Sequence, residues 1–313
     1  MLGKTAGGLF WMFRYLERSE NTARMIDAGL RIALTRSSAA ESEWTSILIS
    51  TGLEEPFRQR HDSFDGGKVI DFLLREKTNP GSVLAAVEAA RNNARMVRTA
   101  LTREVWEAVN ECYMVLKERL ARPIRDRELP EVLQTIRQRT AFVRGALHGT
   151  MLRNDTYDFA RIGTFFERAD NTARILHVKY YILLPSVSHV GRMTDNVQWE
   201  TILRATSSVR AYQTIHEGET NPRGIAHFLI LDRRVPRSLA FCYSKIVDNL
   251  GYLERQYAAR LPCHDLAEST MRHFADREIE EIFDLGLHEF ISDFLRENAA
   301  LGQQIERDYR FIA

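Results

Sequence analysis

The sequence contains little cysteine, and its three cysteines show no paired spacing. Cys112, Cys242 and Cys263 are odd in number and stand far apart. This pattern argues against a disulfide scaffold and fits a reducing compartment, so we expect a cytoplasmic protein. Cys263 precedes His264 and is followed by His273. Adjacent residues lie on different faces of a helix and a fourth ligand is missing, so we predict no metal site.

The chain also lacks long apolar runs and any excess of charge of one sign. No stretch approaches the roughly 18 uninterrupted apolar residues that cross a bilayer, so we expect no membrane association. The apolar segment 7–13 is too short for a signal peptide and runs into Arg14. The 43 basic and 42 acidic residues give a formal charge of +1, and no long-range field draws the chain to nucleic acid.

Familiar catalytic and cofactor motifs are missing as well. No phosphate-binding loop is present, and no serine-histidine-acid or cysteine-histidine set stands in a recognisable local context. We therefore expect no bound cofactor, and the residues by themselves name no reaction.

What the sequence does contain is an internal repeat. Residues 17–24 read Glu-Arg-Ser-Glu-Asn-Thr-Ala-Arg, and residues 167–174 read Glu-Arg-Ala-Asp-Asn-Thr-Ala-Arg. Three later matches follow in the same order, with spacings of 155 to 156 residues: 44–48 with 199–203, 72–74 with 228–230, and 80–83 with 236–239. An ordered series of this kind indicates duplication, with repeats at 1–152 and 153–313.

Helical periodicity dominates both repeats, and no run shows convincing strand alternation. Apolar and small residues at steps of three and four place one face of a long helix at Leu9 to Ala33 and another at Phe159 to Leu183. Further helices are predicted at 41–54, 67–76, 81–121, 129–152, 195–214, 222–232, 237–261, 265–282 and 285–311. The 81–121 stretch can divide into two helices, with Thr102 as the cap of the second. We predict an all-α fold, a helical bundle of two tandem pseudo-symmetric repeats packed as one body and a single domain over 1–313.

Each of the two long helices carries a polar stripe. Residues at i, i+4 and i+7 share a helix face, so Glu17, Asn21 and Arg24 lie together. The second stripe consists of Glu167, Asn171 and Arg174, and Arg18 and Arg168 lie about 100° to one side of the two stripes.

One interpretation of these stripes is structural. Buried charges must be paired, and an acid four residues before a base is the favourable order, as in Glu20 with Arg24 and Asp170 with Arg174. Glu17 and Glu167 would then each meet an arginine of the other repeat across a pseudo-twofold axis.

The other interpretation is functional. Convergent arginines bind carboxylate or phosphate, and a nearby glutamate can orient an amine or act as a base. The candidate catalytic residues are Glu17 and Glu167. The candidate substrate-binding residues are Arg18, Asn21, Arg24, Arg91, Arg95, Arg98, Arg168, Asn171 and Arg174.

A third set of arginines occurs in the first repeat only. Arg91, Arg95 and Arg98 are spaced as one helical stripe, whereas the counterpart segment 244–251 lacks arginine. A site that uses them is therefore asymmetric, and we expect it on the first repeat beside Glu17 and Arg24. The alternative is a solvated or helix-bridging face.

These segments resemble the bacterial alpha-E domain family, a helical family named for its Glu-Arg motif. The matching segments are 15–18, 90–95, 102–110, 166–169 and 236–239, although the family would lead us to expect an acidic residue where Thr99 and Ala100 follow Arg98. The resemblance implies a circularly permuted ATP-grasp protein as partner and a transglutaminase-like protein as a possible one. ATP-grasp enzymes commonly join an activated carboxylate to an amine, which implies a peptide or amide ligation system.

Three functions therefore compete. The first is an accessory subunit that binds an ATP-grasp ligase and helps to hold a carboxylate-bearing or peptide substrate. The second is a stand-alone amide-forming or amide-transferring enzyme that uses Glu17 or Glu167, which must then face an open cavity. The third is a purely structural scaffold, which would tolerate charge-neutral replacement of Glu17 and Arg24 together.

Overall fold

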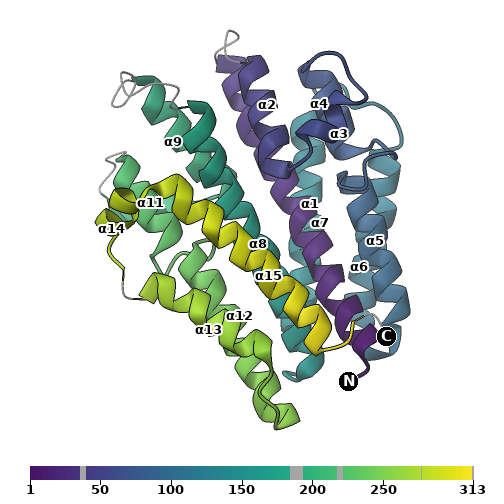
Figure 1. Ribbon diagram of the computed structural model, residues 1–313. Helices are drawn as coiled ribbons and strands as arrows, with labels where there is room; N and C mark the ends of the chain where they lie inside the picture. Colours follow the sequence, from purple (N-terminus) through teal and green to yellow (C-terminus); the bar gives the residue numbers. More distant parts are fainter. Residues whose placement is uncertain (36–39, 184–192, 217–220, 276, 312–313) are drawn as a thin grey trace.

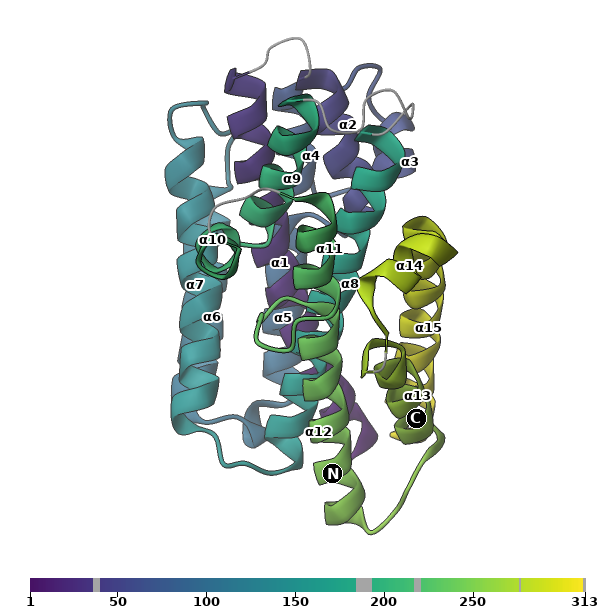
Figure 2. The ribbon, with the colours of Figure 1, turned by 90° about the vertical axis from the view of Figure 1, so that its left-hand side faces the viewer.

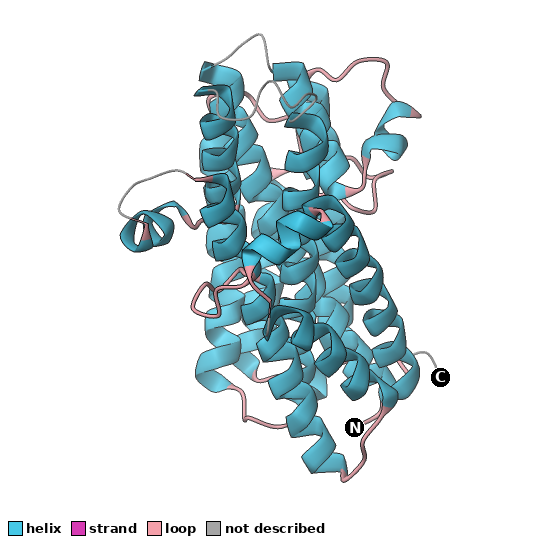
Figure 3. Cartoon of the chain, turned by 60° about the vertical axis from the view of Figure 1, so that its left-hand side comes forward, coloured by secondary structure: helices cyan, strands magenta, loops and turns pink. Residues whose placement is uncertain are grey.

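The computed structural model describes residues 1–35, 40–183, 193–216, 221–275 and 277–311, and these ranges contain helices, turns and loops but no strand (Figure 3). The elements of the first half are α1 (Gly3–Thr35), α2 (Ala40–Thr51), α3 (Glu54–Arg58), α4 (Gly66–Leu74), α5 (Val83–Met96), the 3-10 turn η2 (Arg98–Ala100), α6 (Arg103–Arg119) and α7 (Leu129–Thr150). Those of the second half are α8 (Asp155–Leu183), α9 (Met193–Ala205), α10 (Val209–Ile215), α11 (Pro222–Ile230), α12 (Leu239–Tyr257), α13 (Pro262–Ala275), α14 (Ile279–Leu285) and α15 (Leu287–Asp308). Every helix in these ranges is too short or too polar to cross a bilayer.

Hydroxyl side chains cap the N-termini of three helices, α5, α6 and α12. Ser82 accepts a hydrogen bond from the backbone of Ala85 at the start of α5, and Ser238 accepts one from Phe241 at the start of α12. Thr102 caps α6 in the same way, which confirms that the predicted 81–121 stretch is divided. The predicted helix 195–214 is also divided, into α9 and α10, and 265–282 into α13 and α14, while α3 was not predicted.

The helices α1 and α8 lie side by side in the middle of the molecule (Figure 1). Helices α5, α6 and α7 pack together on the α1 side, and α12, α13 and α15 pack together on the α8 side (Figure 2). Two shorter helices connect the sides, because α2 contacts α8 as well as α1, and α9 contacts α1 as well as α8. The core is therefore shared by both halves of the chain.

The two central helices approach each other closely because a glycine stands at the crossing. A Cβ atom on Gly163 of α8 would lie 2.2 Å from the carbonyl oxygen of Phe10 in α1. The apolar faces predicted for both helices are buried from Leu9 to Ile26 and from Phe159 to Leu176, and Leu30 is partly buried. At the other end of the chain, the ring of Phe311 packs 5.4 Å from that of Phe10, so the last described residues return to α1.

Helices α2 and α9 end in the same local structure. Gly52 and Ser207 follow them in the left-handed conformation, with φ of 71° and 56°. In both cases the next amide bonds a carbonyl five residues back, Leu53 to Leu48 at 2.8 Å and Ser208 to Leu203 at 2.7 Å. This is the Schellman pattern of helix termination.

Candidate functional site

Glu17 of α1 and Glu167 of α8 each form an ion pair with an arginine of the other central helix. Arg168 of α8 donates from Nε to Oε1 of Glu17 at 2.8 Å and from Nη2 to Oε2 at 3.0 Å. Arg18 of α1 donates in the same way to Glu167, at 2.6 and 3.1 Å. Each pair is bidentate, which is the strongest geometry for an arginine and a carboxylate. Each glutamate therefore meets an arginine of the other half of the chain.

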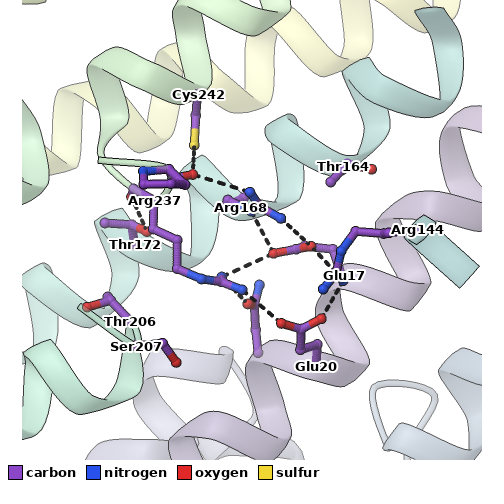
Figure 4. Close-up of polar contacts among 12 residues, drawn as sticks. Glu17, Glu20, Arg144, Thr164, Arg168, Thr172, Thr206, Ser207, Arg237 and Cys242 are labelled. Atoms are coloured by element: carbon purple, nitrogen blue, oxygen red, sulfur yellow. Dashed lines mark hydrogen bonds and ion pairs between the residues drawn. The ribbon is translucent and has the colours of Figure 1, made fainter. Parts of the chain in front are cut away.

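Glu17 is surrounded by further arginines. Arg237, in the loop before α12, donates to Oε1 of Glu17 at 3.1 Å, and Arg144 of α7 lies 3.5 Å from Oε2. Figure 4 shows these side chains directed toward one another. The carboxylate is only 1% exposed. Glu17 therefore lies inside a closed cluster of guanidinium groups.

Glu20 belongs to the same cluster and is fully buried. It accepts hydrogen bonds from Nη2 of Arg24 at 2.6 Å and Nη2 of Arg237 at 3.0 Å, and it is also ion-paired with Arg144. Thr140 of α7 donates to its second oxygen at 3.0 Å. Arg24 is committed twice, because it also donates to the hydroxyl of Ser207.

The charges of this cluster hold its carboxylates ionised. Burial alone would raise the pKa of Glu17, but the neighbouring cations Arg168, Arg237 and Arg144 outweigh burial and hold it well below its usual range. The pKa of Glu167 is lowered to about 2, because Arg18 and Arg14 outweigh its burial. Such a carboxylate is a weak base at neutral pH.

Arg237 was missed as a site residue by sequence reasoning. Arg237 is 8% exposed, and its guanidinium also donates to Oδ1 of Asn21 at 2.8 Å. The backbone carbonyl of Arg237 accepts a hydrogen bond from Thr172 of α8, and the following Ser238 caps α12. The available signal was the repeated Pro-x-Ser pattern at 80–82 and 236–238, which carries an arginine in the second copy only.

A cavity of about 280 Å³ lies beside the cluster, between α1, α2 and α8. The long helices contribute Arg18, Asn21, Glu167, Asp170, Asn171 and Arg174, and the end of α2 and Gly81 line the rest. Arg174 donates to Asp170 at 2.7 Å, the predicted intrahelical pair. The two Glu-Arg helices thus form both a closed ion cluster, around Glu17, and one wall of an open cavity, beside Glu167.

The third arginine set lies elsewhere. Helix α5 ends at Met96, so Arg98 does not continue the stripe of Arg91 and Arg95. Arg91 donates to Asn110 of α6 at 2.7 Å, and Arg98 lies over the ring of Trp106. Arg95 is exposed.

Across the described part of the chain, none of these three arginines bonds to Glu17 or Arg24. The structure therefore does not bring this stripe into direct bonding contact with Glu17 and Arg24, and the joint site stays a prediction. The stripe diverges because α5 turns into η2 and its first arginine faces α6, which is the helix-bridging arrangement.

The cysteine thiols are poorly placed to act as nucleophiles. The three cysteines are buried, and burial raises the pKa of the Cys112 and Cys242 thiols to about 12. No group of three or more metal-binding side chains gathers anywhere in the described ranges. What the arrangement offers is a preorganised set of charges and hydrogen-bonding groups beside a cavity.

A helical body with paired Glu-Arg helices at its centre defines the class of protein. A family model named Alpha-E, described as "a predicted alpha-helical domain with a conserved ER motif", matches residues 1–310. This chain belongs to the Alpha-E family, and the Glu-Arg pairs at 17–18 and 167–168 fit that description.

Curated relatives are much longer proteins. An uncharacterized protein of Mycobacterium bovis and two from strains of Mycobacterium tuberculosis are each 22% identical over 307 residues, which cover 92% of this chain and 34% of the relative. The chain therefore spans about a third of the length of the relatives it matches. No solved structure matches it.

Proposed function

We propose that this chain is an accessory subunit of an ATP-grasp-type peptide or amide ligation system in the cytoplasm. In this role it binds the circularly permuted ATP-grasp ligase and helps to hold a peptide or carboxylate-bearing substrate. Membership in the Alpha-E family supports the proposal. The length of the mycobacterial relatives also fits, because two thirds of each relative lies outside the matched region.

The observation that carries a holding role, and not a catalytic one, is the state of the two candidate glutamates. Both oxygens of Glu17 and of Glu167 accept hydrogen bonds from arginine. A general base needs a free oxygen within reach of its substrate and a pKa near the working pH. Neither carboxylate meets both conditions, so the stand-alone enzyme is the less favoured function.

We also infer that the chain arose by duplication, with repeats at 1–152 and 153–313. The reciprocal pairs of Glu17 with Arg168 and of Glu167 with Arg18 support this inference. So do the matching ends of α2 and α9 and the equivalent packing of α2 on α8 and α9 on α1. One body with two related halves offers a partner two related surfaces.

Co-purification with the ATP-grasp protein tests the partnership. We expect a stable complex at micromolar concentration and ligase turnover that depends on this chain, while the chain alone shows none. A transglutaminase-like protein, the second partner that the family implies, serves as the comparison. Absence of association with the ATP-grasp protein at micromolar concentration would refute the accessory role.

A further inference from the structure

Two loops that occupy matching places in the sequence differ by one side chain. The loop before α5 reads Pro80-Gly81-Ser82 and the loop before α12 reads Pro236-Arg237-Ser238. Both serines cap the helix that follows, so the backbone is used in the same way in both loops. Position 81 lacks the arginine that position 237 carries.

On the α1 side, the guanidinium of Arg237 donates hydrogen bonds to three side chains of α1. Its guanidinium donates to Oε1 of Glu17 at 3.1 Å, to Oε1 of Glu20 at 3.0 Å and to Oδ1 of Asn21 at 2.8 Å. These residues stand at i, i+3 and i+4, so they present their oxygens on one helix face. The chain itself therefore shows which group this arrangement binds.

On the α8 side the same three positions are Glu167, Asp170 and Asn171, and all three line the cavity together with Gly81. Their acceptors have room for another donor. Oε1 of Glu167 accepts only from Arg18, and Asp170 accepts from Arg174 through Oδ2 alone. The side chain of Asn171, a residue that is 9% exposed, has no hydrogen bond to any part of the chain that the structure describes.

We propose that this cavity binds a guanidinium group from outside the chain, in the position that Arg237 occupies in the other half. The ligand is an arginine or a small molecule that carries the same group. A volume of about 280 Å³ suits one side chain, because it holds several waters at roughly 30 Å³ each but falls just below the roughly 300 Å³ of the smallest drug-sized pockets.

The two arginines and two acids of the cavity balance in charge, so the free hydrogen-bond acceptors decide in favour of a guanidinium over an anion. Arg18 and Arg174 are each already paired with an acid, Glu167 and Asp170. An anion would have to compete with those carboxylates, whereas a guanidinium adds donors to oxygens that can still accept them. Asn21 also lines the cavity, and its Nδ2 is buried without a partner in the described ranges.

The guanidinium ligand would specify which substrate the chain holds, and in that respect this proposal rests on the proposed function. The test is calorimetric titration of the isolated chain with L-arginine and with L-citrulline, which replaces the guanidinium by a neutral urea. We expect saturable binding of one L-arginine and at least tenfold weaker binding of L-citrulline. Glutarate, an anion alone, is expected not to bind.

A variant that places an arginine side chain of the chain itself in the cavity tests the proposal directly. A Cβ atom at position 81 lies 3.1 Å from a terminal methyl of Leu53 and 3.2 Å from Oδ1 of Asn79, so both side chains must shift slightly, and the backbone there is not left-handed. Gly81→Arg is therefore expected to abolish L-arginine binding. Gly149→Arg adds the same side chain where a Cβ atom meets nothing within 4 Å and is expected to bind as the unmodified chain does.

A second variant covers the case in which Gly81→Arg does not fold. Asn171→Ala removes one acceptor and is expected to weaken L-arginine binding at least fivefold. The proposal is overturned if the unmodified chain does not bind L-arginine at 10 mM, if L-citrulline binds equally well, if glutarate binds instead, or if folded Gly81→Arg still binds. None of these results affects co-purification with the ligase, so the two proposals fail separately.

Discussion

At the scale of single residues, the unusual feature is a guanidinium that is buried and still charged. Burial lowers the pKa of Arg237 to about 10, although Glu17 and Glu20 act in the opposite direction. A pKa of this size keeps the side chain protonated at neutral pH. The cluster is therefore balanced among several charges, and removal of one acid leaves the others uncompensated.

The first prediction concerns Glu17. Glu17→Gln keeps the shape of the side chain but removes the charge that faces Arg168, Arg237 and Arg144. Because loss of one partner from a buried ion pair costs about 3–5 kcal/mol, we expect a loss of unfolding free energy of that order, measured by urea denaturation. The matched control is Glu107→Gln, which breaks the exposed pair with Arg103 and is expected to leave the urea midpoint unchanged. Equal midpoints for both variants would contradict the role of the cluster.

The second prediction concerns the buried Asp158 near the start of α8. Burial, with the nearby Asp155, raises the pKa of Asp158 from 3.8 to about 7. The native state then holds a proton that the unfolded chain has lost, so stability falls as the pH rises from about 4 to 7 and levels off above that. Asp158→Asn removes this pH dependence. We expect the variant to have a higher melting temperature than the unmodified chain at pH 8 but not at pH 4. Parallel thermal melts at both pH values measure the difference; an equal shift at the two values would argue against a titrating Asp158.

At the scale of helices, what could be predicted from sequence is what depends on short spacing. The buried faces of α1 and α8 follow from steps of three and four. The pair of Arg24 with Glu20 follows from an i+4 spacing, as does that of Arg174 with Asp170. Thr102 marked the start of α6 because a capping side chain acts within its own turn.

The rest could not be predicted because it depends on contacts between distant segments. Arg237 reaches Glu17 from 220 residues away, and no local spacing reports such a contact. The spacing of Arg91, Arg95 and Arg98 predicted one continuous stripe, but α5 ends at Met96 and Arg98 lies in η2. The cavity likewise exists only where α1, α2 and α8 meet.

The third prediction concerns the crossing of α1 and α8. Gly163→Ala places a Cβ atom 2.2 Å from a backbone oxygen, which cannot move aside as a flexible side chain can. We expect the free energy of unfolding to fall by about 1–3 kcal/mol, the usual range for overpacking, as measured by thermal or urea unfolding. Gly145→Ala in α7 is the matched control. Its Cβ atom meets nothing within 4 Å, so better helix propensity is expected to stabilise the chain by about 0.5–1 kcal/mol. Similar effects of the two substitutions would refute close packing at Gly163.

At the scale of the whole molecule, the two halves depend on each other. Glu17 obtains Arg168 and Arg237 from the second half, and Glu167 obtains Arg18 from the first. Helices α2 and α9 each pack on the central helix of the other half. A half on its own would expose unpaired charges and the apolar contact face of its long helix.

The fourth prediction follows from this dependence. Segments 1–152 and 153–313, produced separately, are expected to lack cooperative unfolding and to regain it when mixed in equal amounts. Circular dichroism during urea titration, together with the elution volume of the mixture, measures both properties. The intact chain serves as control and is expected to unfold in one transition, because its two halves share one hydrophobic core. Independent cooperative unfolding of either segment would show that the halves are separate domains.

The long reach of Arg237 also has a consequence for synthesis. A ribosome adds roughly 5–20 residues per second, so the 220 residues between Glu17 and Arg237 take roughly 11–44 s to produce. During that interval Glu17 and Glu20 have been made, but Arg237, which donates hydrogen bonds to both, has not. The ion cluster around Glu17 and Glu20 can therefore be completed only after Arg237 has been made, and α15 and Phe311, which pack on the central helices, follow later still.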